Sequence, residues 1–144
     1  NAYSFFHPLR VRHAEIDLQG VVFNAHYLTY FDTAITEYLR DAGYNYKALF
    51  TTRGLDFHLV KATVEFLRPI VFDLLIEIGV RVSRIGTSSI TFAPAIFAQD
   101  QTQDQKDQPE CLAKGEIVWV CAKVGTHKSH PLPPDFVALL KQES

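Results

Sequence analysis

Asp17 is the residue of this sequence that is best placed to do chemistry. It stands in the stretch AEIDLQGVVFNAHYLTYFDTAITEYLRDAG (residues 14–43), a few residues before the predicted start of a long amphipathic helix. Amides at a helix start carry partial positive charge and can polarise a carbonyl group. A nearby ionised carboxylate can attack that carbonyl or activate a water molecule. The stretch therefore predicts a hydrolytic site, with an aspartate that only caps a turn as the plainer alternative.

Two neighbours of Asp17 complete the predicted catalytic group. Gly20 allows a backbone conformation or a close approach that a side chain would block. Asn24 is the expected N-cap, so the amides near Phe23, Asn24 and Ala25 should begin the helix. The Asn24 side chain either caps the helix or contacts the substrate, and the sequence does not favour one of these.

Aromatic and histidine side chains are predicted to bind the substrate around this group. Tyr27 and Phe31 are expected to wall the pocket, with core packing as an equal alternative. His26 falls in the first helical turn, where a surface or structural role is the commoner one. Asp32 is kept as a possible second carboxylate. The predicted substrate-binding residues in this part of the chain are Phe23, His26, Tyr27, Phe31, His58, which precedes the second predicted strand, and Val60.

The composition limits what else the chain can be. Its 144 residues predict one domain, 1–144, and a net charge of −2 speaks against a nucleic-acid partner. No apolar run reaches the roughly 18 residues of a membrane span. Cys111 and Cys121 do not match zinc spacing, and no metal-ligand cluster is present, so we expect free thiols and no metal. The N-terminal residues do not resemble a secretory signal, and we expect a cytoplasmic protein.

The elements that must position Asp17 follow from periodicity. Apolar residues recur at helical spacing from Tyr27 to Ala42, and Gly43 is a natural C′ residue. Alternating segments predict strands over 9–14, 60–66, 74–83, 90–96 and 111–123, with Pro94 marking a bulge or an edge. The polar tract 98–110 is predicted to be an exposed hairpin tip, and 131–142 to contain a short terminal helix. One helix against one antiparallel sheet is an α+β arrangement.

Several motifs in register resemble the hotdog-fold acyl-CoA thioesterases of the 4-hydroxybenzoyl-CoA thioesterase type. The most specific is D-x-x-G-x-V-x-N-x-x-Y-x-x-Y-F, met by Asp17, Gly20, Val22, Asn24, Tyr27, Tyr30 and Phe31. FDTAITEYL, VKATVEFLRPIVFDLLIEI, RIGTSSITF and AKGEIVWV extend the resemblance over nearly the whole chain. Phe72 and Val21 depart from the family pattern, which often has Gly and His at these positions. The change at Val21 bears on the identity of the substrate, not on the class of reaction.

The resemblance implies a hotdog fold, in which a curved antiparallel sheet of about five strands wraps a long central helix. It implies hydrolysis of an acyl-CoA to free acid and coenzyme A. Asp17 would act as nucleophile, through a mixed anhydride, or as general base, and the Asn24 amide would polarise the thioester. Coenzyme A is part of the substrate, so no separate cofactor is expected. The family pairs subunits through a sheet edge, which implies a homodimer or a homotetramer built as a dimer of dimers, with active sites at the dimer interface.

The phosphates of coenzyme A need donors, and the best candidates are Arg84, Thr87 and Ser88 at a predicted hairpin. Two other functions remain open from the sequence. A hotdog hydratase or dehydratase acting on acyl thioesters would normally need a histidine working with the carboxylate, and neither His26 nor His58 falls in such a motif. A non-catalytic acyl-CoA-binding protein would keep the fold and would not need Asp17.

Overall fold

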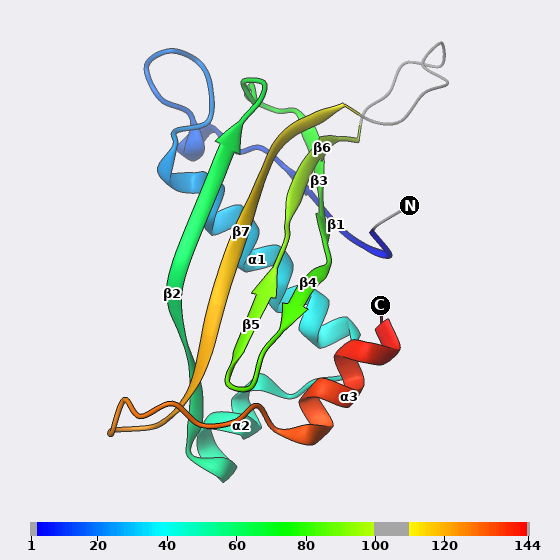
Figure 1. Cartoon of the computed structure of the whole chain (residues 1–144). Coiled ribbons are helices and arrows are strands. Elements are labelled where there is room, and N and C mark those ends of the chain that lie inside the picture. The colour runs from blue at the N-terminus through cyan, green and yellow to red at the C-terminus, as the bar shows by residue number, and fades with distance from the viewer. Residues whose placement is uncertain (1–2, 100–109, 144) are drawn as a thin grey trace.

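A computed structural model describes residues 3–99 and 110–143 of the chain, and in them one long helix lies against an antiparallel sheet (Figure 1). This confirms the predicted α+β class. The elements are β1 (Phe5–Arg10), the short 3-10 helix η1 (His13–Glu15), α1 (Ala25–Asp41), α2 (Tyr46–Arg53), β2 (Leu55–Phe66), β3 (Leu75–Val80), β4 (Val82–Ile85), β5 (Ser89–Phe92), β6 (Ala95–Ala98), β7 (Cys111–Lys123) and α3 (Pro134–Glu143). Most of the predicted hairpin tip at 98–110 lies outside the described residues.

The described sheet has seven strands instead of about five, because two predicted strands are each interrupted. Its order is β1-β3-β6-β7-β5-β4, with β2 paired to the other side of β7. Only Arg81 separates β3 from β4, and only Ala93 and Pro94 separate β5 from β6. Pro94 has no amide hydrogen to give to the ladder. Each of the predicted strands over 74–83 and 90–96 is therefore present as two shorter strands.

The bounds of two strands and the presence of one helix differ from the prediction. The first strand is β1 at 5–10, not 9–14, because Arg12 and Glu15 pair with each other across the 3-10 turn that follows it. The second strand, β2, begins at Leu55, so the expectation that His58 precedes it is wrong: His58 lies within β2. The helix α2 was not predicted from periodicity.

The ends of α2 nevertheless carry local signals. The Asn45 side chain accepts a hydrogen bond from the Ala48 amide at 3.0 Å, and Gly54 ends the helix with a φ of 65°. An Asn cap and a left-handed glycine are the ordinary start and stop of a helix. The eight residues between them show little amphipathic pattern, so the apolar spacing alone does not reveal the helix.

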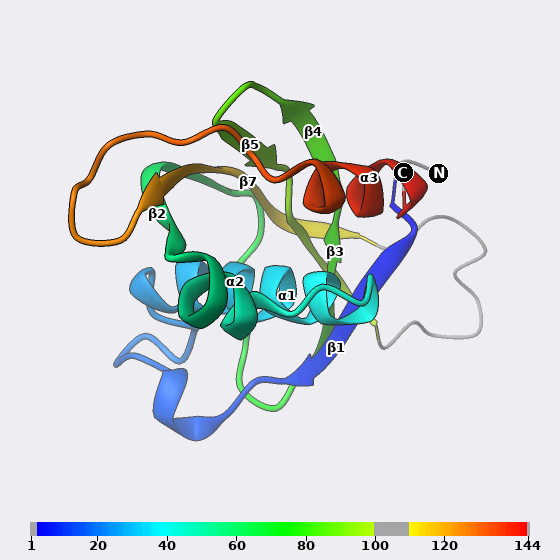
Figure 2. The same cartoon turned by 90° about the horizontal axis from the view of Figure 1, so that it is seen from below.

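The predicted long helix is confirmed as α1, and the sheet curves around it (Figure 2). Gly43 follows the helix with a φ of 89°, as expected for a C′ residue. One face of α1 is buried against the inner face of the sheet. The buried residues of α1 are Tyr27, Tyr30, Phe31, Ala34, Ile35, Tyr38 and Leu39. The predicted terminal helix is confirmed as α3, whose buried Phe136 packs against Tyr44 and Phe57.

Gly115 of β7 lies in close contact with both β2 and α1. A Cβ at this position would lie 2.2 Å from the Thr63 carbonyl oxygen and 2.7 Å from Cε2 of Phe31. We expect Gly115→Ala to lower the free energy of unfolding by about 1–3 kcal/mol or more, because overpacking forces the backbone apart. Urea unfolding measures this change. Lys114→Ala, an exposed position on the same strand, should stay within about 0.5 kcal/mol of the wild type.

Candidate active site

Asp17 lies in a tight turn closed by its own backbone. The Asp17 amide donates to the Val21 carbonyl at 2.9 Å, the Gly20 amide donates to the Asp17 carbonyl at 3.0 Å, and Gly20 has a φ of 80°. One carboxylate oxygen, Oδ1, accepts the Gln19 amide at 2.8 Å. The turn-capping role is therefore real, but Oδ2 makes no hydrogen bond within residues 3–99 and 110–143. The half-buried carboxylate keeps one oxygen free to react.

The start of α1 offers two unpaired amides. The Val22 amide donates to Ile70 and the Phe23 amide to Glu15, at 2.8 and 2.9 Å. The next two amides, of Asn24 and Ala25, have no acceptor among the described residues, whereas those of His26 and Tyr27 bond within the first turn. The Asn24 side chain makes no capping bond, and the first turn contains no acidic residue. The amides of Asn24 and Ala25 thus remain available for an external oxygen.

Tyr27 lies next to Asp17 at the start of α1. It is 3% exposed, and its ring packs on Phe66 with the centroids 4.8 Å apart. Burial raises the pKa of Tyr27, a backbone hydrogen bond at Ile70 opposes this, and the negative charge of Asp17 raises the pKa further. The phenol therefore stays protonated at neutral pH and can act as a hydrogen-bond donor.

A small cavity opens beside the start of α1. Its volume is about 230 Å³. The residues that line it are Val21, Val22, Asn24, Tyr27, Phe66, Leu67, Arg68 and Pro69. The cavity joins the turn that carries Asp17, the helix start and the end of β2. Its walls are mainly apolar, with the Asn24 end of the helix on one side, which suits a carbonyl compound with an apolar substituent.

The other residues predicted around the helix start have mixed environments. Phe23 is 50% exposed, and its ring lies 6.2 Å from that of the half-buried His26. Phe31 is fully buried and points at Gly115, so it packs in the core, which was the alternative to a pocket wall. The substrate-binding roles of Phe23, His26 and Tyr27 stay predictions.

The remaining predicted residues lie on β2 and at the β4–β5 hairpin. His58 and Val60 are exposed in the first half of β2, which begins beside α2. The β4–β5 hairpin carries Arg84, Thr87 and Ser88. In Figure 1 it lies at the opposite end of the molecule from the turn that contains Asp17, which is the blue loop just before α1. The Thr87 and Ser88 carbonyls accept the Leu132 and Cys121 amides at 2.9 and 2.8 Å. A single subunit does not bring this hairpin to the carboxylate.

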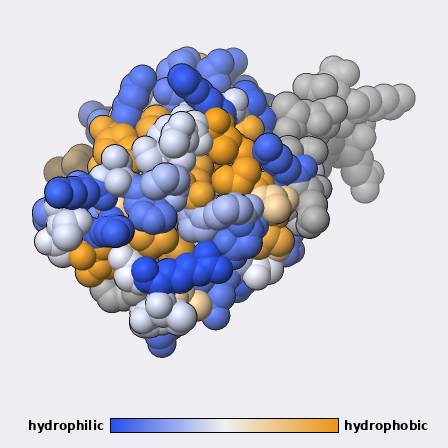
Figure 3. Space-filling view, turned by 60° about the horizontal axis from the view of Figure 1, so that its bottom comes forward, coloured by the Kyte–Doolittle hydropathy of each residue, from blue (hydrophilic) through white to orange (hydrophobic). Residues whose placement is uncertain are grey.

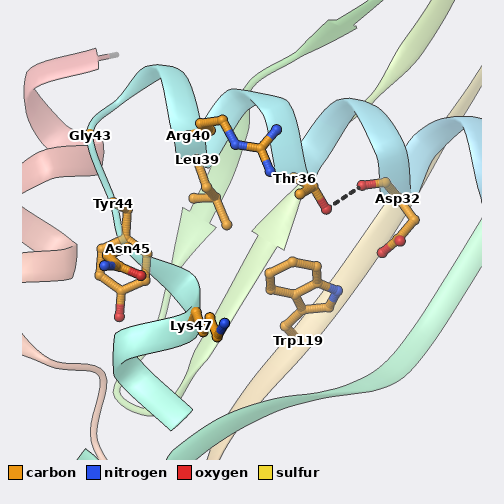
Figure 4. Close-up of a pocket in the computed structure, with 9 residues that line it drawn as sticks. All are labelled: Asp32, Thr36, Leu39, Arg40, Gly43, Tyr44, Asn45, Lys47 and Trp119. Carbon is orange, nitrogen blue, oxygen red and sulfur yellow. Dashed lines mark hydrogen bonds between the residues drawn. The ribbon is translucent and has the colours of Figure 1, made fainter. Parts of the chain in front are cut away.

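A larger cavity of about 610 Å³ lies between the second half of α1, the start of α2 and β7 (Figure 4). Asp32 and Trp119 project towards it from α1 and β7. Partial desolvation raises the pKa of Asp32, whose carboxylate has no hydrogen-bond partner within the described part of the chain. The lining residues are Asp32, Thr36, Leu39, Arg40, Gly43, Tyr44, Asn45, Lys47 and Trp119. Most of them were not predicted, because the cavity depends on the position of α2.

The described residues also bear on metal binding and on membrane insertion. No group of three or more His, Cys, Asp or Glu side chains in 3–99 and 110–143 is arranged to hold a metal ion. Within the same ranges, no helix combines the length and the apolar character that crossing a bilayer requires.

Known proteins match this chain over nearly its whole length. The model of the thioesterase-like superfamily matches residues 11–140. The acyl-CoA thioester hydrolase YbgC of Escherichia coli O157:H7 is 30% identical over 142 residues, which cover 99% of each chain. The 1,4-dihydroxy-2-naphthoyl-CoA hydrolase of Nostoc punctiforme is 30% identical over 138 residues, 96% of this chain and 87% of that one.

A solved structure supports the fold independently of sequence identity. The crystal structure of a 4-hydroxybenzoyl-CoA thioesterase variant in complex with 4-hydroxybenzoyl-CoA superimposes with a TM-score of 0.84 at 16% identity, covering 94% of this chain and 97% of that one. This likeness confirms the predicted hotdog fold. At that identity it says nothing about the substrate.

Proposed function

We propose that this chain, which belongs to the thioesterase-like superfamily, hydrolyses acyl-CoA thioesters to free acid and coenzyme A. One observation carries the proposal. A half-buried carboxylate with a free oxygen, Asp17, lies just before a helix whose Asn24 and Ala25 amides are unpaired, and a largely apolar cavity opens beside them. The relationship to an acyl-CoA thioester hydrolase over 99% of the chain supports the same reaction.

The amides at the start of α1 would polarise the thioester carbonyl group. The thioester carbonyl oxygen would accept hydrogen bonds from the Asn24 and Ala25 amides, which no intrachain acceptor among the described residues competes for. Negative charge grows on that oxygen when the carbonyl carbon becomes tetrahedral, so these bonds strengthen in the transition state. One such donor typically contributes about 2.7–4 kcal/mol to lowering the barrier.

Asp17 would act in one of two ways, as the nucleophile or as a general base. As nucleophile, its carboxylate oxygen bonds to the thioester carbon, the carbon–sulfur bond breaks, and coenzyme A leaves as a thiolate that takes a proton. Water then splits the mixed anhydride into the acid and free Asp17. As general base, Asp17 takes a proton from a water molecule that attacks the thioester carbon directly.

A single turnover in ¹⁸O-labelled water tests the nucleophilic role, because label in the Asp17 carboxylate can arise only through the mixed anhydride. If Asp17 is the general base, the label enters the product acid in the first turnover. If Asp17 is the nucleophile and water attacks its anhydride carbonyl, the label enters the Asp17 carboxylate and the first product acid is unlabelled. Mass spectrometry of the product and of the peptide that contains Asp17 reads both positions.

We also propose that the active unit is a dimer joined through β2. This strand pairs only with β7 in the described chain, so its other edge is open over twelve residues. Leu59, Val60 and Phe66 of β2 are 57%, 58% and 52% exposed. Such an open, apolar strand edge is one that proteins normally cover or pair. By contrast, the end of the molecule turned forward in Figure 3 shows apolar side chains divided by polar ones.

A dimer of this kind would also explain why the predicted phosphate donors lie far from Asp17. Antiparallel pairing of two β2 strands places the beginning of one beside the end of the other. The β4–β5 hairpin with Arg84, Thr87 and Ser88 lies at the end where β2 begins, and the Asp17 turn lies at the end where β2 finishes (Figure 1). We therefore propose that the arm of coenzyme A reaches these residues on the second subunit. Pairing of two dimers into a tetramer stays a prediction.

A cytoplasmic location is part of the same proposal. The chain contains two cysteines, Cys111 and Cys121, and both are free thiols. Free thiols are typical of proteins that work in a reducing compartment.

Incubation with a panel of aliphatic and aromatic acyl-CoAs tests the function directly. We expect release of free thiol, detected with a thiol reagent, at a rate that saturates with substrate for at least one acyl group. Loss of the absorbance of an enoyl-CoA without thiol release would instead indicate a hydratase. Tight binding of acyl-CoA without either reaction would indicate a binding protein.

A further inference from the structure

Glu15 is the buried charged residue of the described chain that the proposed reaction does not use. The residue is 6% exposed, and it stands two residues before Asp17, in the 3-10 turn η1. Carboxylates are rarely this buried unless their oxygens are bonded. The contacts of Glu15 show which parts of the molecule it connects.

Its carboxylate contacts two separate elements. Oε1 accepts the Tyr30 hydroxyl at 2.7 Å and the Arg12 amide at 2.9 Å. Oε2 accepts Nε of Arg12 at 2.9 Å and lies 2.9 Å from its Nη2. Tyr30 is a buried residue of α1, whereas Arg12 follows β1. The carboxylate thus ties the chain leading into the Asp17 turn to the body of the central helix.

The backbone of Glu15 makes a second connection. Its carbonyl accepts the Phe23 amide at 2.9 Å, immediately before the two free amides of Asn24 and Ala25. The next residue, Ile16, forms a single bridge with Val22. The turn between them projects into solvent, since Leu18 at its tip is fully exposed. The hydrogen bond between Glu15 and Tyr30 therefore joins the start of this turn to α1, and the bond from the Phe23 amide joins it to the residues just before α1.

The protonation states of Glu15 and Tyr30 favour the hydrogen bond between them. Burial acts to raise the pKa of Glu15, but the hydrogen bonds from the Arg12 backbone, Tyr30 and the Arg12 side chain lower it overall. Burial and the bond to Glu15 raise the pKa of Tyr30, which keeps its hydroxyl protonated as the donor. A carboxyl group with a lowered pKa stabilises the fold above its ordinary pKa and loses that contribution as the pH falls through the lowered value. The hydrogen bond from Tyr30 to Glu15 is therefore intact at neutral pH.

We propose that Glu15 is a positioning residue, which acts with Tyr30 to hold the Asp17 carboxylate at a fixed distance from the start of α1. This inference rests on the proposed role of Asp17. Attack on a carbonyl needs the carboxylate and the amide donors in one geometry, and a displacement of about 1 Å can cost about 100-fold in rate. Glu15 does not touch the substrate in this scheme.

Tyr30→Phe is the sharper of two test variants, because it removes one hydroxyl and keeps the ring that fills the core. Glu15→Gln keeps the shape but places an amide where a carboxylate faced Arg12. For both folded variants we expect kcat to fall about 10- to 100-fold with KM changed less than about threefold, because the geometry of the reacting groups changes and not the binding surface. Asp135→Asn breaks an ion pair with Arg53 elsewhere and should leave both constants unchanged.

A combined variant separates positioning from general damage. If Glu15 and Tyr30 act through Asp17, adding Tyr30→Phe to Asp17→Asn should not slow the residual reaction further. A kcat equal to wild type in folded Tyr30→Phe and Glu15→Gln, while Asp17→Asn is inactive, would overturn the positioning role alone. Wild-type activity in Asp17→Asn would instead overturn the proposed function on which it depends. A full additional loss in the combined variant would also reject the inference.

Discussion

Asp17→Asn is expected to lower kcat for acyl-CoA hydrolysis by about 100-fold or more while the protein stays folded. The substitution keeps the size of the side chain and the acceptor for the Gln19 amide, but it removes the charge. A neutral amide can neither attack the thioester carbon nor take a proton from water, and general bases alone contribute about 10²–10⁴ in rate. Thiol release from the best acyl-CoA of the panel measures the loss.

A matched control for this variant is Asp41→Asn. Asp41 is exposed at the last turn of α1, at the other end of the helix from Asp17. The same chemical change there should leave kcat within about twofold of the wild type, because Asp41 itself has no role in the proposed reaction. Equal activity of Asp17→Asn and the wild type would reject the mechanism, whatever the control shows.

Leu59→Glu is expected to convert the dimer into monomers and to abolish hydrolysis with it. Leu59 pairs with Trp119, so its side chain lies on the inner face of the sheet, yet it is 57% exposed in the single chain. A glutamate there costs the monomer little. In the proposed dimer it would bury an unpaired charge, which costs several kcal/mol and should weaken association at least about 100-fold. Analytical ultracentrifugation over a range of concentrations measures the change.

Val124→Glu provides the comparison for this second prediction. Val124 is also an exposed apolar residue, at 43%, but it follows β7, the strand on the paired edge of β2, and its amide donates to the Gly54 carbonyl just before β2. We expect this variant to dimerise and to hydrolyse acyl-CoA as the wild type does. An active wild-type monomer, or a Leu59→Glu variant that remains dimeric at low concentration, would contradict the proposed interface.

Local patterns predicted the frame of this protein well. The helix at 25–41, its start beside Asn24 and its end before Gly43 follow from apolar spacing and terminal residues, which act within a few turns. The strand at 111–123 follows from alternation. The differences from the prediction also concern short segments of the chain. A proline splits one strand, and α2 has caps but little amphipathic pattern.

The sequence by itself determined that a carboxylate, Asp17, stands in a glycine turn just before a helix start, because turns and helix ends depend on neighbouring residues. Only the tertiary structure decided which amides at that start remain free, since the Val22 amide bonds to Ile70, far away in the chain. It also decided that Glu15 is buried against Tyr30 and that Arg84 lies at the opposite end of the subunit. These features depend on which segments distant in the sequence pack together, and local residue spacing does not predict such contacts.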